Sequence, residues 1–516
     1  MDLKKLALNF GRLLLAISLS IMPVFPAQAQ LTEKPLTLLT GKPNESTGVV
    51  LQRTSKGLYR NIEANFDLSI GEGGEEAAFT LLNEFENGGK GGSFEKIDWA
   101  KPGLKRSLQV VFTTRNPPTQ DYFNKDGNFY DRPQREVALF WDGTEIVRKL
   151  SSIEYRTGAP KPVKILIAYA TGGAEVSLSI VGAAIYSRFF IADAAPYESR
   201  PAFSGRGGAV GTKLEFSKVN VRYSEKIQPP EPAMILRAVN DKILDKDNAR
   251  QSSEVPFPVE NRRFGRIICT LTLSKPEKGF DPWDRKGAVY LYDEKGERFE
   301  LLRFITPYHR GFVWRVDVSD FRPLLTGKRK IEAWCETYGT GWNCTVEFAF
   351  YPGKSDRYAS KVQNLWTGNA EIGNPDKPVS AFFAPKEVEL GVGANSAKLR
   401  LTITGHGQAP NDQNAAEFMP SKRTVFIGER KFENLLWKED CYLNPCRPQG
   451  GTWKFDRAGW APGDIVRPWE IELKKSAKTG KSLKISYDIE PYVNSARGKG
   501  DAPHYWTESV LISYGR

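Results

Sequence analysis

The stretch KLEFSKVNV at residues 213–221 decides the fold class, because apolar and polar side chains alternate along it. Alternation with a period of two places successive side chains on opposite faces of a β-strand. Similar patterns occur at 64–70, 164–169 and 175–180, and turn signals such as Asp142-Gly143 separate the candidate strands. Many short strands joined by Gly- and Pro-rich turns predict an all-β protein of sandwich or jelly-roll type.

The length of 516 residues predicts about two to four domains. Pro229-Pro230-Glu231-Pro232 is typical of a linker, and a second boundary is indicated between Tyr351 and Pro375. Residues 237–246 are the best candidate for a helix, with a loop as the alternative. The predicted folded units are 31–226, 233–352 and 376–516.

Residues 1–30 have the composition of a secretory signal peptide. Lys4, Lys5 and Arg12 precede an apolar run over 13–25, and a small-x-small cleavage site at 27–29 follows it. The run is too short to span a bilayer comfortably, and no other stretch is apolar enough to do so. The sequence therefore predicts a secreted or periplasmic protein without a membrane span.

Export makes disulfides possible, and the chain has five cysteines. Proximity in sequence predicts the pairs Cys335–Cys344 and Cys441–Cys446, although spacing alone leaves other pairings open. Cys269 lies in an apolar run and is predicted to be a buried free thiol. A zinc site is disfavoured, because the sequence has no Cys-x-x-Cys pair.

The formal net charge is +12, and the basic residues are spread along the chain. This distribution favours a soluble basic secreted protein over a nucleic-acid-binding one, and we expect a monomer. The stretch NKDGNFYD at 124–131 has alternating oxygen-bearing side chains that suit calcium. A hairpin turn is the favoured interpretation of that stretch.

The trio Trp283-Asp284-Arg285 is the strongest candidate for a chemical site. The indole can stack on a sugar face, the carboxylate can transfer a proton, and the guanidinium can hold that carboxylate in place. Glu336 and Glu417 lie in similarly aromatic contexts. Together the three acids predict a carboxylate-based site for a glycan substrate.

Short motifs follow one another through the second half of the chain: PWDR at 282–285, RFITPY at 303–308, CET at 335–337, AEF at 416–418, GTW at 451–453 and DRAGW at 456–460. In this order they resemble the bacterial peptide-N-glycosidase F family. The resemblance implies two consecutive jelly rolls with the site at their interface. It implies cleavage of the amide between an asparagine side chain and the first N-acetylglucosamine of N-glycosylated proteins or glycopeptides, without metal or cofactor.

By position, the resemblance implies that Asp284 is the principal catalytic carboxylate, that Glu417 acts through a bound water and that Glu336 supports Asp284. Carboxylates this close together would raise the pKa of at least one of them. His406 and Phe418 differ from the residues usual in the family, which predicts a different glycan preference. The positions expected around the substrate are Arg285, Arg457, Trp283, Trp460, His406, Phe418 and Tyr338.

Residues 31–226 resemble a concanavalin-like lectin or glucanase sandwich. This implies carbohydrate binding, with a structural spacer or a cap over the cleft as alternatives. Two other functions of the whole chain stay open: a glycoside hydrolase, which also uses two carboxylates, and a non-catalytic glycan-binding or adhesin protein. A copper monooxygenase is disfavoured, because the only histidines are His309, His406 and His504, widely spaced.

Overall fold

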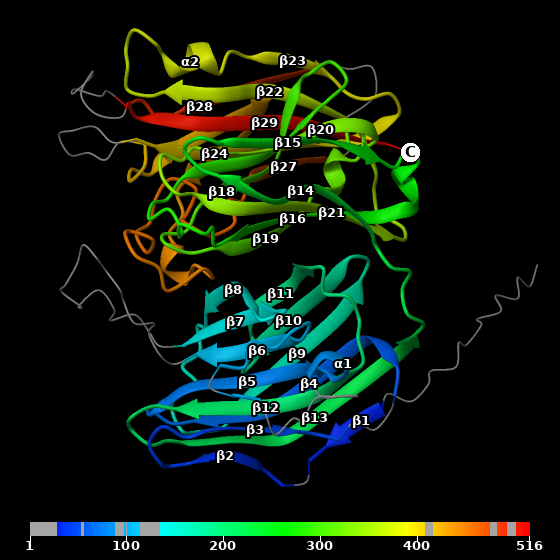
Figure 1. The fold of residues 1–516 in the computed structure, drawn as a ribbon, viewed down its shortest axis with the longest axis vertical. Helices are drawn as coiled ribbons and strands as arrows, with labels where there is room; N and C mark the ends of the chain where they lie inside the picture. Colours follow the sequence, from blue (N-terminus) through cyan, green and yellow to red (C-terminus); the bar gives the residue numbers. More distant parts are fainter. Residues whose placement is uncertain are drawn as a thin grey trace, which may run out of the picture.

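The computed structural model describes residues 28–32, 34–52, 56–87, 97–99, 101–113, 135–407, 416–474, 482–492 and 502–515. The predicted signal peptide up to residue 27 and the stretch at 124–131 lie outside these residues. The described part is all-β, as predicted: six sheets pair into three sandwiches (Figure 1). Its α-helices are the short α1 (Glu84–Asn87) and α2 (Val379–Phe382). No helix among the described residues is long and apolar enough to cross a membrane.

The first sandwich contains a sheet of order β1-β13-β4-β9-β10-β11, with β2 also on β13, and a sheet of order β3-β12-β5-β6-β7-β8. Its strands are β1 (Gln28–Leu31), β2 (Leu36–Thr40), β3 (Ser46–Val50), β4 (Leu58–Ile70), β5 (Gly74–Asn83), β6 (Leu108–Thr113), β7 (Glu136–Trp141), β8 (Thr144–Leu150), β9 (Lys161–Ala170), β10 (Gly173–Ile180), β11 (Ala183–Ala192), β12 (Ser199–Gly207) and β13 (Lys213–Ile227).

The stretch at 213–221 forms the first part of β13. Leu214 and Phe216 are buried, and so are Val219 and Val221, so the buried set moves from even to odd positions. A register shift against β4 and a positive φ of 50° at Lys218 account for this change. The bulge keeps both halves of the strand facing one core.

The second sandwich consists of two four-stranded sheets, β14-β21-β16-β19 and β15-β20-β17-β18. The predicted helix at 237–246 is wrong, because these residues lie mainly in β14, which pairs antiparallel with β21. Two register shifts within β14 interrupt its alternation, and this hides the strand in the sequence. The strands are β14 (Met234–Leu244), β15 (Arg250–Phe257), β16 (Phe264–Ser274), β17 (Lys286–Tyr292), β18 (Arg298–Ile305), β19 (Phe312–Asp317), β20 (Gly327–Cys335) and β21 (Trp342–Pro352). The 3-10 turns η2 (Asn261–Arg263) and η3 (Ser319–Phe321) connect them.

The third sandwich has the sheets β22-β29-β24-β27 and β23-β28-β25-β26. It begins at residue 359 and not at 376, because β22 pairs with β29 along its length. Turn signals on both sides of β22 place it in a linker when only the sequence is read. The strands are β22 (Ala359–Glu371), β23 (Lys386–Glu389), β24 (Ala394–His406), β25 (Ser421–Ile427), β26 (Arg430–Leu436), β27 (Trp469–Lys474), β28 (Ser482–Ile489) and β29 (His504–Gly515), with the 3-10 turn η4 (Cys441–Leu443) between β26 and β27.

The second and third sandwiches meet at an interface that combines hydrophobic packing with a buried polar network. Arg303 of β18 has a fully buried side chain and forms an ion pair with Glu300 at 2.9 Å. The same guanidinium donates to Thr404 Oγ1 at 3.0 Å and to the Trp506 carbonyl at 2.7 Å, both in the third sandwich. These bonds fix the relative position of the two jelly rolls, and therefore of the loops at their common end.

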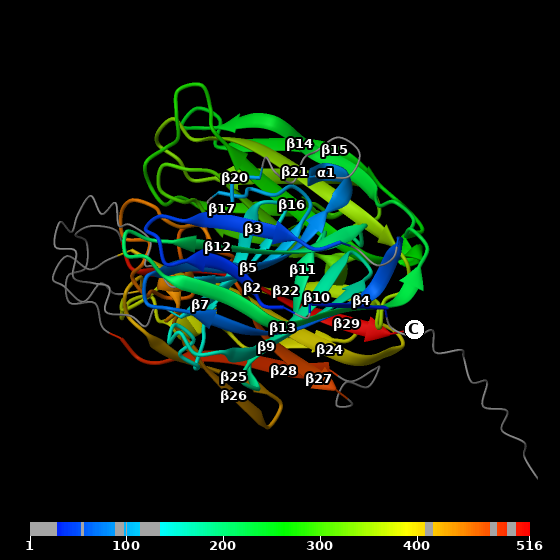
Figure 2. The same cartoon turned by 90° about the horizontal axis from the view of Figure 1, so that it is seen from below.

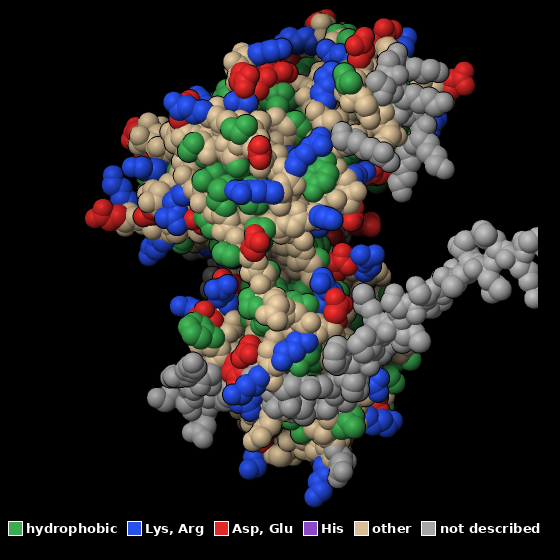
Figure 3. Space-filling model, turned by 90° about the vertical axis from the view of Figure 1, so that its right-hand side faces the viewer, with side chains coloured by type: hydrophobic (Ala, Val, Ile, Leu, Met, Phe, Trp, Pro, Cys, Tyr) green, Lys and Arg blue, Asp and Glu red, His purple; other side chains and the backbone are tan. Residues whose placement is uncertain are grey.

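The first sandwich lies against both jelly rolls (Figures 1 and 2). In Figure 1 the loops between β26 and β27 face it next to β8. Figure 3 shows basic and acidic side chains interspersed over one face, as expected from the spread of charge along the sequence.

All five cysteines are buried and unpaired, so the two predicted disulfides are wrong. Cys335 ends β20 in one sheet, whereas Cys344 lies in β21 of the facing sheet. The thiol of Cys441 lies 3.4 Å from the Lys438 carbonyl and 3.5 Å from that of Trp460, as a donor to both. Closeness in sequence does not set side-chain direction, which a disulfide requires.

Candidate active site

The loop that precedes β17 is built around Asp281, which is fully buried. Its carboxylate accepts hydrogen bonds from the Trp283 amide at 3.0 Å and from Thr337 Oγ1 at 2.8 Å. Arg285 Nε lies 3.4 Å from the same carboxylate. The prediction that Arg285 holds Asp284 is therefore wrong: its partner is Asp281. Asp281 thus fixes the turn that presents Asp284.

Thr306, at the end of β18, fixes this loop from the opposite side. Its hydroxyl accepts from the Arg285 amide at 2.7 Å and donates to the Trp283 carbonyl at 2.9 Å. The residues on both sides of Asp284 are thereby bonded to one side chain. A carboxylate held in this way loses little further freedom when it binds a substrate.

Arg457 is the centre of the site and its side chain is fully buried. Its Nη1 lies 3.3 Å from Asp284 Oδ2 and 3.3 Å from Glu417 Oε1. The two carboxylate oxygens are therefore no farther apart than twice that distance. Nη2 donates to Thr452 Oγ1 at 3.0 Å, and Nε to the Phe455 carbonyl at 3.2 Å. This guanidinium joins a carboxylate of the second sandwich to one of the third.

Tyr308 is a site residue to which the sequence assigned no role. Its hydroxyl donates to Asp284 Oδ2 at 2.7 Å and lies 3.0 Å from Thr452 Oγ1. The motif RFITPY contained it, but only the fold shows that its hydroxyl reaches the carboxylate. Asp284 therefore has two donors, one of them charged.

Burial raises the pKa of Asp284, and the Arg457 charge and the Tyr308 hydrogen bond only partly oppose this effect. Burial and the nearby Asp284 charge also raise the pKa of the Tyr308 phenol. Tyr308 therefore stays protonated and acts as a donor over the range of ordinary pH. Asp284 can hold a proton at a pH where an exposed aspartate has lost it.

Glu417 is positioned by backbone bonds to the loop that carries Arg457. Its carbonyl accepts from the Ala458 amide at 2.8 Å, and the Ala458 carbonyl accepts from the Gly405 amide at 3.0 Å. A positive φ of 70° at Ala416 turns the chain immediately before it. The end of β24, the turn at Glu417 and the Arg457 loop therefore form one hydrogen-bonded unit.

Glu336 does not join Asp284 and Glu417. Its carboxylate pairs with Lys286 Nζ at 3.1 Å, and its side chain is 36% exposed. Lys286 Nζ is also 3.3 Å from His504 Nε2. The structure thus brings together two of the three predicted acids, and it places Glu336 directly after β20, where its amide donates to the Lys286 carbonyl at 2.8 Å.

Two exposed aromatic side chains come from the segments that precede β17 and follow β20. Trp283 is 48% exposed and Tyr338 is 69% exposed. The Tyr338 ring lies 5.1 Å from the Arg285 guanidinium. Both predicted positions are therefore available to stack on a sugar.

Trp460 and His406 are buried, so the prediction that they line the cleft is wrong. Their rings stack at 5.1 Å, and the Trp460 indole donates to the Gly405 carbonyl at 2.8 Å. Burial, with the nearby Lys286 charge, lowers the pKa of His406 well below its ordinary value and keeps the ring neutral. The half-buried Phe418 ring lies 4.8 Å from the Arg457 guanidinium. These rings pack beneath the site and support Arg457.

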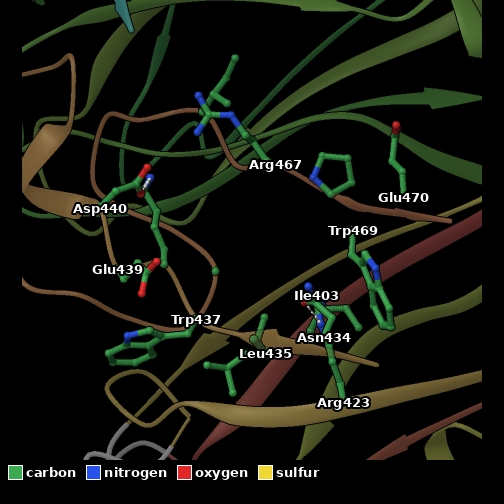
Figure 4. A pocket seen from close by; sticks show the side chains of 15 residues that line it. Ile403, Arg423, Asn434, Leu435, Trp437, Glu439, Asp440, Arg467, Trp469 and Glu470 are labelled. Atoms are coloured by element: carbon green, nitrogen blue, oxygen red, sulfur yellow. Dashed lines mark hydrogen bonds and ion pairs between the residues drawn. The ribbon is translucent and has the colours of Figure 1, made fainter. Parts of the chain in front are cut away.

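Among the described residues, no group of three or more His, Cys, Asp or Glu side chains is arranged to hold a metal ion. A cavity of about 400 Å³ lies elsewhere, at the open edge of the third sandwich between β26 and β27. Figure 4 shows Trp437 and Trp469 on opposite sides of it. Neither Asp284 nor Glu417 lines this cavity, so it is separate from the carboxylate site.

Comparison with known proteins finds the following similarities. A family model described as "Peptide-N-glycosidase F, C terminal" matches residues 378–512. Peptide-N(4)-(N-acetyl-beta-D-glucosaminyl)asparagine amidase F of Elizabethkingia miricola is 31% identical over 298 residues, which cover 53% of this chain and 83% of the relative. A structure of PNGase F, a glycosylasparaginase from Flavobacterium meningosepticum, has 26% identity and a TM-score of 0.50, and covers 55% of this chain and 96% of its own. A structure of PNGF-II has 14% identity and a TM-score of 0.43, and covers 88% and 99% respectively.

Proposed function

Since this chain belongs to the peptide-N-glycosidase F family, we propose that it hydrolyses the amide between asparagine and the first N-acetylglucosamine of N-glycosylated proteins or glycopeptides. The observation that carries the proposal is the bridge from Asp284 through Arg457 to Glu417. It supplies two carboxylates and a fixed positive charge at one point. The immediate products are a peptide in which aspartate replaces asparagine and a glycan whose first sugar carries the former amide nitrogen as a glycosylamine, which then loses ammonia to water.

Amide hydrolysis needs an activated water, a proton for the leaving nitrogen and stabilisation of the oxyanion. Asp284 has a raised pKa and is the group that exchanges a proton with the glycosylamide. Glu417, which shares Arg457 Nη1 with Asp284, orients the water. Arg457 stabilises the negative charge that develops on the tetrahedral intermediate. Trp283 and Tyr338 bind the sugar, and Glu336 contacts it from the strand end.

Several further properties belong to the proposal. Export by a signal peptide over residues 1–30 would place the enzyme where N-glycoproteins occur, in the periplasm or outside the cell. We also propose that it acts as a monomer and without metal or cofactor. Carbohydrate binding by the first sandwich stays a prediction.

Mass spectrometry of an N-glycopeptide incubated with the purified protein tests the proposal. We expect glycan release with conversion of asparagine to aspartate, reduced at least about 100-fold in Asp284→Asn. Asp317→Asn is the matched control, because Asp317 is a surface partner of Arg266 outside the site. Release that leaves asparagine unchanged would instead identify a glycoside hydrolase. Binding without release would identify a glycan-binding protein.

A further inference from the structure

Residues 447–452 form the support on which Tyr308 rests. Gln449 Oε1 accepts the Tyr308 amide at 3.0 Å, and Thr452 Oγ1 lies 3.0 Å from the Tyr308 hydroxyl. Gly451 packs so closely on the ring that a Cβ there would lie 2.6 Å from it. Thr452 also accepts from Arg457 at 3.0 Å. This segment therefore holds both donors of Asp284.

The segment begins at Arg447, whose side chain is bound to the first sandwich. Arg447 Nη2 donates to Glu136 Oε2 of β7, and the two side chains are 3% and 4% exposed. Arg447 Nη1 donates to the Tyr442 carbonyl at 2.9 Å. Arg310 Nη1 donates to the Pro448 carbonyl at 2.9 Å and is a second anchor, from the jelly roll itself.

Glu136 forms ion pairs with two guanidinium groups. It belongs to a cluster of two arginines, Arg148 and Arg447, and two glutamates, Glu136 and Glu145. Arg148 Nη1 lies 3.0 Å from the same Oε2, and Arg148 also binds Glu145 at 2.8 and 2.7 Å. Without the Glu136 charge, Arg148 would keep Glu145 as its partner. Among the described contacts, Arg447 would keep no carboxylate. A buried cation without a partner is strongly unfavourable, so Arg447 would move towards water and release the segment.

We propose that Glu136 of the first sandwich is a positioning residue for the site, which acts through Arg447 and the 447–452 segment on Tyr308 and Arg457. The first sandwich is then part of the support of the active site, whether or not it binds sugar. The kinetic part of this inference rests on the proposed function, whereas the structural part does not.

The full-length Glu136→Gln variant tests this proposal against Glu145→Gln. The control removes a carboxylate of the same cluster, also buried at 9% exposure, that binds Arg148 but not Arg447. For Glu136→Gln we expect kcat on a glycopeptide to fall about 10-fold or more, with KM changed less than about 2-fold. The Tyr308 amide should exchange with deuterium about 10-fold faster or more, because its acceptor Gln449 is loosened. Both quantities should stay near wild type in Glu145→Gln.

Unchanged kcat and unchanged exchange at Tyr308 in folded Glu136→Gln would overturn the proposal. Equal effects in Glu145→Gln would also overturn it, because they would show that any charge lost from the cluster has this result. If the wild-type protein releases no glycan, the proposed function fails, and the exchange comparison still decides the positioning role. Asp193→Asn, at the same interface through Tyr351 but away from residues 447–452, should leave the exchange unchanged.

Discussion

Removal of the Tyr308 hydroxyl should move one limb of the pH–activity profile to higher pH. The hydroxyl donates to Asp284 Oδ2 at 2.7 Å and stabilises the ionised carboxylate. A hydrogen bond to a charged group contributes about 1.5–3 kcal/mol. One pH unit corresponds to about 1.4 kcal/mol, so Tyr308→Phe should raise the pKa of Asp284 by about one to two pH units. The ring that packs on Gly451 is retained, so the loss is confined to the hydrogen bond.

The assay is kcat/KM on an N-glycopeptide from about pH 4 to 9, which reports ionisation in the free enzyme. If Asp284 works as a base, the acid limb moves up; if it works as an acid, the alkaline limb moves up. Tyr505→Phe is the matched control, because it removes a buried hydroxyl bond of 2.8 Å to Ser421 and touches no site carboxylate. A profile of folded Tyr308→Phe that superimposes on wild type at both limbs would refute the assignment of Asp284.

Three further outcomes are expected. Gly451→Ala should lower kcat about 10- to 100-fold, because Gly451 has a φ of +65° and its Cβ would displace the Tyr308 ring. Gly428→Ala is the control for backbone strain in unfolding and kinetic assays, because Gly428 has a φ of +59° and open space around it. Burial and the neighbouring Glu300 raise the pKa of Glu508 to about 7 from an ordinary 4.5, so its charge destabilises the fold as pH rises through that window. Glu508→Gln removes the ion pair with Arg298, and its unfolding free energy relative to wild type should increase from pH 4.5 to pH 8 in denaturant titrations; an equal effect at both pH values would contradict this. Glu336→Gln should raise KM more than it lowers kcat, because Glu336 lies beside the Asp284–Arg457–Glu417 bridge and not in it; a loss of kcat as large as that of Asp284→Asn would contradict this placement.

Local alternation was enough to predict the class of the fold but not its irregularities. The buried positions of β13 are visible in the sequence, whereas the bulge at Lys218 appears only as a change of phase. In β14 two such register shifts fall within one strand. They interrupt the alternation of apolar and polar side chains, so the sequence predicts a helix there. The sequence predicts a linker at β22 because turn signals lie on both sides of it. Such signals occur at the two ends of a strand as well as between domains. The long-range pairing of β22 with β29 shows that this segment is a strand and not a linker.

In the site, the sequence predicts which residue types are present better than it predicts which side chains contact one another. Asp284 and Glu417 were predicted from the motifs around them, and the structure places both on Arg457. Adjacency in sequence predicts Asp284 as the partner of Arg285, but the loop before β17 brings Arg285 to Asp281 instead. Trp460 suits either a sugar platform or a core, and only its 2% exposure identifies the core. Sequence thus indicated which groups are present, and the fold determined which of them touch.

The charges at the Asp284–Arg457–Glu417 bridge explain why Asp284 retains a proton more readily than an exposed aspartate. Arg457 is fully buried and supplies one positive charge for two carboxylates, and Tyr308 is held in its protonated form. Burial disfavours the ionised form of Asp284, and the Arg457 charge and the Tyr308 hydrogen bond only partly oppose this effect. The raised pKa of Asp284 is the result of this balance. The pKa of Asp284 depends on the positions of Arg457 and Tyr308. Glu136 of the first sandwich, which we propose to act on these positions, can therefore affect this pKa without contacting Asp284.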